Sequence, residues 1–123
     1  MSNGSTTGFI SLQQAIEMTT RYRQNKADVI NPVYAGNDIL SVCDTFNKAA
    51  IETLLAKPDC TAIRLYYGMN ANLQVRPMLV AVNQNNEDIL PPITANMTIA
   101  GDSIVDDTLR CPPFCPPPSA LNS

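Results

Sequence analysis

The chain contains no histidine, no tryptophan and only five glycines among its 123 residues. Histidine is the commonest general base and metal ligand, so its absence excludes Ser-His-Asp and Cys-His catalytic arrangements and histidine-ligated zinc. The glycines are scattered, and they form neither a Walker motif nor a dinucleotide-binding fingerprint. These absences remove most familiar enzyme chemistries.

The chain is also poor in positive charge, with eight basic against eleven acidic residues and a net charge of −3. Nucleic-acid binding needs clustered Lys and Arg, so the composition predicts no nucleic-acid partner. No segment approaches the ~20 apolar residues of a membrane span. The polar first residues lack the features of a secretory signal, which favours a cytoplasmic location and leaves signal-independent export or cell-surface assembly as alternatives.

Two helices are predicted. Ser11 and Gln14 are spaced as a capping box, and apolar residues then recur at helical spacing, which predicts a helix over 12–25. A second helix is expected over about 45–56, with Phe46 on its inner face.

Short apolar segments downstream predict strands. They lie at residues 39–42, 61–67, 73–82, 88–90 and 99–105. In the second of these, alternation places Ile63, Leu65 and Tyr67 on one face, which we expect to lie beneath the helices.

Pro77 interrupts the strand expected at 73–82. Because proline cannot donate to a ladder, it predicts an edge strand or a bulge. The sheet face away from the helices carries Arg64, Tyr66, Arg76 and Met78, and this mixed polar and apolar set is a candidate contact surface.

Together these elements predict an α+β fold, with two helices on one face of a small antiparallel sheet of three or four strands. Its length indicates a single domain. We assign residues 1–9 to a polar N-terminal arm, 10–107 to the domain and 108–123 to an extended Cys/Pro-rich tail.

The four cysteines are Cys43, Cys60, Cys111 and Cys115. Their spacing lacks the paired C-x-x-C knuckles of a zinc site, so no metal is predicted. A helix between Cys43 and Cys60 would separate them by roughly 20 Å, too far for a disulfide. A Cys111–Cys115 bond, a bond from the tail to Cys43 or Cys60, and two free buried thiols at those inner positions all remain open.

Acidic residues cluster at 87–88, 102 and 106–107. Paired carboxylates can perform acid–base chemistry or hold calcium, but the glycine and distal glutamate of a calcium loop are missing here. We interpret these residues as solvated turns, and we predict no cofactor and no catalytic residue.

The tail is the most unusual segment, because five of the ten prolines lie between residues 112 and 118. Such a run favours polyproline II, which adds little to a core and is suited to lying on another surface. Phe114 is its one large apolar side chain. The predicted interaction residues are Cys111, Pro112, Pro113, Phe114, Cys115 and Pro116.

Three segments carry a resemblance to known proteins: Phe-Asn-Lys-Ala-Ala-Ile-Glu-Thr-Leu-Leu-Ala at 46–56, Ile-Arg-Leu-Tyr-Tyr-Gly-Met at 63–69 and Cys-Pro-Pro-Phe-Cys-Pro-Pro-Pro at 111–118. With them, the chain resembles, over about residues 10–118, a group of small uncharacterised bacterial proteins that share an I-R-x-Y-Y-G-M strand and a C-P-P-x-C-P tail. The group has no assigned activity, so the resemblance implies no residue role.

The hypothesis that best fits the sequence is a non-enzymatic structural or interaction protein. We expect it to self-associate through its terminal arms, as an oligomer or a filament subunit, because a monomer would leave both arms mobile. One alternative is a thiol-dependent enzyme or redox factor that uses Cys111 and Cys115. Another is an intracellular adaptor whose polyproline tail binds a partner's groove.

Overall fold

The computed structural model describes residues 8–91 and 101–123 of the chain. In order, its elements are α1 (Leu12–Asn25), the 3-10 helix η1 (Pro32–Asn37), β1 (Cys43–Phe46), α2 (Lys48–Leu55), β2 (Ala62–Met69), β3 (Val75–Val82), β4 (Ile104–Val105) and β5 (Thr108–Cys111). They form two antiparallel sheets, β2-β3-β4 and β1-β5, so the predicted α+β class is confirmed.

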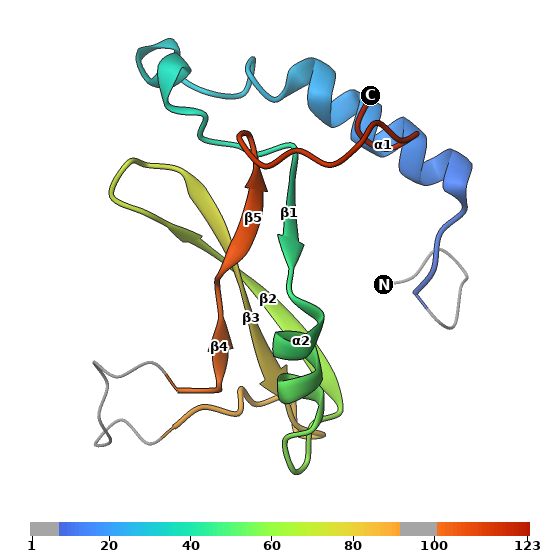
Figure 1. Cartoon of the computed structure of the whole chain (residues 1–123), viewed down its shortest axis with the longest axis vertical. Helices are drawn as coiled ribbons and strands as arrows, with labels where there is room; N and C mark the ends of the chain where they lie inside the picture. Colours follow the sequence, from blue (N-terminus) through green and yellow to red (C-terminus); the bar gives the residue numbers. More distant parts are fainter. Residues whose placement is uncertain (1–7, 92–100) are drawn as a thin grey trace.

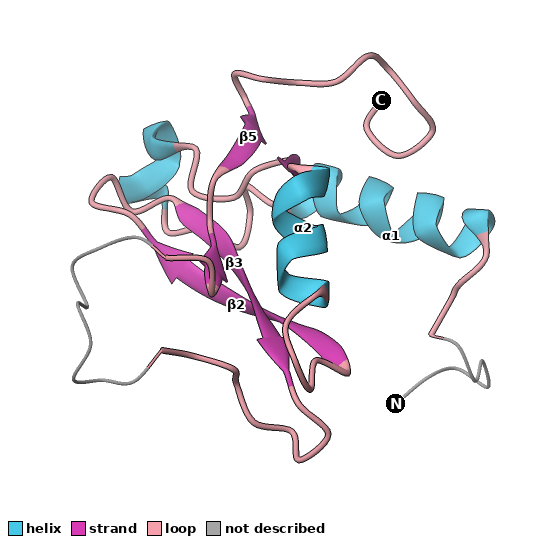
Figure 2. Cartoon of the chain, turned by 60° about the horizontal axis from the view of Figure 1, so that its bottom comes forward, coloured by secondary structure: helices cyan, strands magenta, loops and turns pink. Residues whose placement is uncertain are grey.

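One part of the molecule, which we call the sheet body, consists of β2, β3, β4 and α2 (Figure 2). Its core is the cluster of Leu54 from α2 with Leu79 and Ala81 from β3. Leu54 is completely buried. Phe46, Ile51, Cys60, Ile63, Ile89 and Val105 pack around this cluster.

The other part, which we call the upper layer, consists of α1, η1, the two-stranded ribbon β1-β5 and the tail at 112–123 (Figure 1). The capping box of α1 forms as predicted, with the Gln14 N–H donating to Ser11 Oγ at 3.1 Å and the Ser11 N–H to Gln14 Oε1 at 3.0 Å. Neither α1 nor η1 contains a buried residue. Figure 1 shows α1 above the ribbon and beside the tail, whereas Leu54 of α2 packs on the sheet.

The second helix begins later than predicted. Residues 43–46 form β1 instead, and Asn47 caps α2 by accepting the N–H of Ala49 at 2.8 Å. Phe46 accordingly reaches the core from a strand rather than from a helix. The strand expected at 39–42 does not form, but its Ile39 carbonyl accepts the N–H of Val75 at 2.8 Å. The helix begins later because residues 43–46 pair with β5 in an extended conformation, and Asn47 is the next residue able to cap a helix.

β3 is the central strand of its sheet, so the prediction that it is an edge strand is wrong. Its contact with β4 is limited to Leu79 and Val80, which leaves Pro77 paired only with Tyr67 of β2 among the described residues. The Val75 N–H and the Ala81 carbonyl both bond away from β2. Pro77 is an even number of residues from both positions along β3, so its backbone groups also point away from β2. The N–H that proline lacks therefore removes no bond from the β2-β3 ladder.

β2 forms where it was predicted, but its burial differs. Ile63 packs against the core, whereas Leu65 is 43% and Tyr67 81% exposed. The expectation that all three lie beneath the helices is therefore wrong. Helix α2 has eight residues, about 12 Å, and the eight-residue strand extends over about 26 Å, so one short helix cannot cover it.

The opposite face of the sheet carries the predicted mixed set. The register pairs Arg64 with Val80, Tyr66 with Met78 and Gly68 with Arg76, so these side chains share one face. Glycine at 68 has a steric role, because a Cβ there would come within 3.0 Å of the Met78 side chain.

The segment predicted as a tail from residue 108 begins with a strand. β5 pairs with β1 in the register Cys43–Cys111, Asp44–Arg110, Thr45–Leu109 and Phe46–Thr108. Within it Thr108, Arg110 and Cys111 are buried. The expectation that this stretch adds little to the core was wrong for residues 108–111, because the prolines begin only after them.

The remaining strand predictions have mixed outcomes. Residues 88–90 contribute one isolated bridge, Val82 to Asp88, rather than a strand. Of the strand expected at 99–105, Ile104 and Val105 form β4, and residues 99–100 lie outside the described part of the chain. The same is true of residues 1–7 of the predicted N-terminal arm.

Candidate interaction site: the disulfide-closed tail and its anchors

The tail leaves the ribbon through a small covalent loop. Cys111, the last residue of β5, is disulfide-bonded to Cys115, with their Cα atoms 4.3 Å apart. The Phe114 N–H donates to the Arg110 carbonyl at 2.8 Å and closes the same turn. Of the open sequence alternatives, the structure thus contains the Cys111–Cys115 bond.

The loop displays the predicted interaction residues unequally. Cys111 is buried and belongs to the ribbon. Pro112, Pro113, Cys115 and Pro116 are exposed. Phe114 is 60% exposed, which leaves a large aromatic side chain at the tip of a constrained turn. An exposed aromatic on a rigid loop is a typical anchor for a protein contact.

A network of polar side chains fixes the base of this loop. Asp44 of β1 accepts hydrogen bonds from Ser41 Oγ and Thr108 Oγ1, both at 2.7 Å. Arg76 of β3 donates to Thr108 Oγ1 at 3.2 Å, which links the ribbon to the sheet body. The buried Arg110 donates to the Asp38 and Ile39 carbonyls, so a charged group is held here mainly by backbone acceptors.

Helix α1 is tied to the same network. The Tyr22 hydroxyl donates to the Ser41 carbonyl, and Lys26 Nζ donates to the Leu40 carbonyl at 3.2 Å. Partial burial raises the pKa of Tyr22, with Arg110 acting in the opposite sense and Asp44 in the same sense. The phenol therefore stays neutral and remains a hydrogen-bond donor.

The end of the tail folds back onto α1 (Figure 1). Arg23 donates to the Leu121 carbonyl and, at 3.1 Å, to the Ser123 carbonyl oxygen. The segment at 112–123 is thus held at both ends, by the ribbon and by α1, rather than projecting freely.

Cys43 and Cys60 are free thiols and half-buried. Cys60 packs beside the core. Cys43 lies directly opposite Cys111 in the β1-β5 register, so a free thiol neighbours a disulfide on the same face of the ribbon. The sequence left a bond between the tail and Cys43 open as one alternative, but it predicted neither strand and so could not place Cys43 opposite Cys111.

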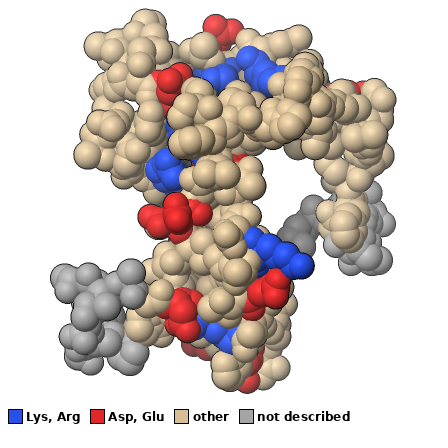
Figure 3. Space-filling view, in the orientation of Figure 1, with Lys and Arg blue, Asp and Glu red and all other residues tan. Residues whose placement is uncertain are grey.

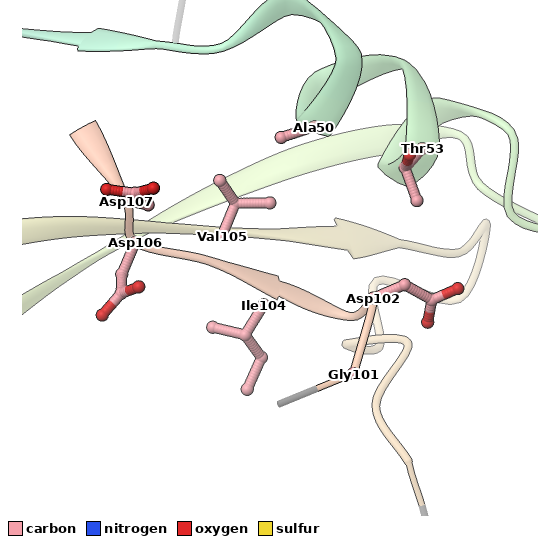
Figure 4. A pocket seen from close by; sticks show the side chains of 8 residues that line it. All are labelled: Ala50, Thr53, Gly101, Asp102, Ile104, Val105, Asp106 and Asp107. Atoms are coloured by element: carbon pink, nitrogen blue, oxygen red, sulfur yellow. The ribbon is translucent and has the colours of Figure 1, made fainter. Parts of the chain in front are cut away.

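The acidic residues do not come together. Asp102, Asp106 and Asp107 line a hollow of about 290 Å³ between α2 and β4, with Asp102 at the opposite end from the other two (Figure 4). Lys57 binds Asp102 at 2.8 Å and lowers its pKa. Within the described residues, no group of three or more metal-binding side chains is assembled.

Asp88 belongs to a second network, on the outer face of the sheet. The Tyr66 hydroxyl and Arg64 Nη1 each bind one of its carboxylate oxygens at 2.5 Å. The hydrogen bond from Tyr66, and then those of Arg64, lower the pKa of Asp88. Alternation in residues 63–67 predicted the shared face of Arg64 and Tyr66, but nothing predicted their common partner.

Charges are mixed over the face of the molecule seen in Figure 3, where acidic and basic side chains alternate without a large patch of one sign. Among the described helices, none is long and apolar enough to cross a bilayer.

Comparison with protein-family models, with curated proteins and with solved structures gives no match. The resemblance to small bacterial proteins with a C-P-P-x-C-P tail therefore stays a prediction.

Proposed function

We propose that this protein is a non-enzymatic structural protein that self-associates through the upper layer, where α1 and the tail at 112–123 lie side by side. The proposal keeps the predicted role of the terminal segments and places it on a folded surface rather than on free arms.

One observation carries the proposal: a fourteen-residue helix without a single buried residue. On the apolar stripe of α1, Leu12 is 64% and Tyr22 36% exposed, although this periodicity is that of a helix that packs against something. Most helical stability in proteins comes from packing an apolar face, so a partner surface is expected to cover this one.

The tail adds a second apolar contribution to the same layer. Phe114 is held on a five-residue disulfide loop, which removes most of the conformational entropy that a free arm would lose on docking. A copy of the chain offers complementary apolar material in the exposed stripe of α1, so self-association needs no additional partner.

The proposal is tested by the mass of the protein in solution. We expect wild type to form dimers or larger species in multi-angle light scattering, and Leu12→Glu and Phe114→Ala to shift them toward monomer by about tenfold in concentration. Leu55→Ala is the matched control, because Leu55 is an exposed apolar residue of α2, outside the upper layer. A wild type that stays monomeric at every concentration would contradict the proposal.

A thiol–disulfide role is the second candidate, and the position of Cys43 opposite Cys111 favours it. Attack by the Cys43 thiolate on the Cys111 sulfur would form a Cys43–Cys111 bond and release Cys115 as a thiolate. Disulfide mapping by mass spectrometry after incubation at mildly alkaline pH tests it. Recovery of only the Cys111–Cys115 pair would remove this candidate and leave self-association unaffected.

A further inference from the structure

β2 is an edge strand with an unoccupied side. The sheet order β2-β3-β4 gives it one neighbour, β3, along its full length from Ala62 to Met69. Within residues 8–91 and 101–123, no backbone hydrogen bond reaches its other side. An edge of eight residues is longer than the typical strand of five or six.

The register identifies which backbone groups face outward. In β3, the Val75 N–H bonds to the Ile39 carbonyl and the Ala81 carbonyl accepts from Ile89, so these alternate positions point away from β2. In an antiparallel ladder the residues directly opposite such positions also point away. These residues of β2 are Ile63, Leu65, Tyr67 and Met69, opposite Ala81, Leu79, Pro77 and Val75 respectively.

The residues that usually prevent an edge strand from pairing with another chain are absent from β2. Between Ala62 and Met69 there is no proline and no lysine, and Arg64 is bound to Asp88 on the face of the sheet. Leu65 and Tyr67, which turn their backbone groups outward, are also exposed in their side chains. The edge is therefore a template for another strand.

We propose that β2 pairs antiparallel with β2 of a second copy, around a two-fold axis at Leu65. This inference rests on the proposed self-association but names a different surface. Leu65 then lies opposite Leu65 of the second copy, and Ile63 opposite Tyr67 in both directions. Three of the four outward positions, Ile63, Leu65 and Tyr67, find bonded partners, which gives roughly six hydrogen bonds, and Met69 extends beyond the paired residues.

The side chains favour this occupant and this register. On the core face, the apolar side chains of Ile63, Leu65 and Tyr67 contact the same three side chains of the second copy. This contact covers apolar surface that α2 leaves exposed. On the outer face, Arg64 lies opposite Tyr66 of the second copy, whose hydroxyl binds the negative Asp88. A register shifted by two residues, with the axis at Tyr66, would also pair Met69, but it would place the two Tyr66–Asp88 pairs, each with a negative carboxylate, opposite one another across the axis. The edge is thus complementary to itself.

The pairing joins two three-stranded sheets into one continuous sheet through the two-fold axis. Because an isologous contact of this kind is closed, it produces a dimer in which neither β2 edge is left free. The upper layer of each copy remains available for the contact of the proposed function, and two different contacts on one chain allow open-ended growth.

Site-directed disulfide formation tests the register directly. Across a bonded antiparallel pair the Cα atoms lie about 5.5 Å apart, within disulfide range, so Leu65→Cys should link to itself under mild oxidation. Tyr67→Cys is the matched control, because its two copies would lie four residues apart along the strands, about 13 Å. A mixture of Ile63→Cys and Tyr67→Cys should link only as the mixed pair.

We expect the 65–65 peptide to exceed the 67–67 peptide by at least about tenfold in mass spectrometry, since distance controls the reaction. Equal yields would overturn the register. No 65–65 link in a protein that still associates by light scattering would overturn β2 pairing and leave the proposed function standing. A monomer at all concentrations would overturn both.

Discussion

The sheet body and the upper layer are stabilised by different kinds of interaction. In the sheet body, Leu54, Leu79 and Ala81 form an apolar cluster, and among the described residues Leu54 is the one large side chain fully removed from water. In the upper layer, two of the three buried residues of β5 are polar, and α1 is attached by hydrogen bonds of Tyr22, Arg23 and Lys26.

The difference suggests which part folds by itself. Apolar burial contributes about 25 cal/mol per Å², whereas a hydrogen bond exchanged with water contributes only about 0.5–1.5 kcal/mol net. We therefore expect the sheet body to dominate the free energy of unfolding. The hydrogen bonds of the upper layer fix the positions of α1, the ribbon and the tail. Its exposed apolar side chains are then available for contacts with other molecules.

A substitution at Leu54 is the strongest test of the expectation that the sheet body dominates the free energy of unfolding. Leu54→Ala should reduce the free energy of unfolding by about 2–5 kcal/mol, because it leaves a cavity in the apolar cluster of the sheet body. Leu55→Ala, its neighbour on the same helix and 55% exposed, is the control and should change it by less than about 0.5 kcal/mol. Urea denaturation of both variants measures the difference, and equal losses would contradict this view of the core.

In the upper layer, Asp44 has the role in the polar network that Leu54 has in the apolar cluster of the sheet body. Asp44→Asn removes the negative charge beside the buried Arg110 and weakens the bonds to Ser41 and Thr108, so we expect a loss of about 1–3 kcal/mol. Asp107→Asn, exposed and without a side-chain bond to the described residues, is the control. If thermal melts of the two variants coincide, the network does not stabilise the ribbon.

The smallest expected effect lies on the outer face of the sheet. Because the Tyr66 hydroxyl lowers the pKa of Asp88, Tyr66→Phe should move that pKa up toward its ordinary value of 3.8. A lowered pKa stabilises the fold above 3.8, and this contribution is lost as the pH falls through the folded value. NMR titration of the Asp88 carboxyl measures the shift, with the exposed Tyr67→Phe as control; an unchanged pKa would exclude the bond.

Local signals predicted much of the fold. The capping box at Ser11 and Gln14 gave α1 its bounds, and alternation in residues 63–67 gave β2 its faces, because both depend on neighbours in sequence. The depth of burial of Leu65 depends instead on how far α2 reaches over the sheet, which is a tertiary property. Sequence pattern indicates a face, not the length of what covers it.

The candidate site was less predictable. The prolines drew attention to residues 112–118, whereas the preceding Thr108 to Cys111 pair with a segment more than sixty residues away. The β-branched Thr108 was a usable but weak signal, and the burial of three of the four residues of β5 follows only from the folded structure. The network around Asp44 had no local signal, since its members come from separate elements.

Pro77 also matters before the protein is folded. The five residues that follow it, Met-Leu-Val-Ala-Val, are the most continuous apolar, strand-forming stretch of the chain and would be the first to aggregate in a nascent polypeptide. A proline directly in front of such a stretch acts as a gatekeeper against cross-β stacking. Since its ring nitrogen faces the gap beside β4, this protection during synthesis is obtained without removing a bond between β2 and β3.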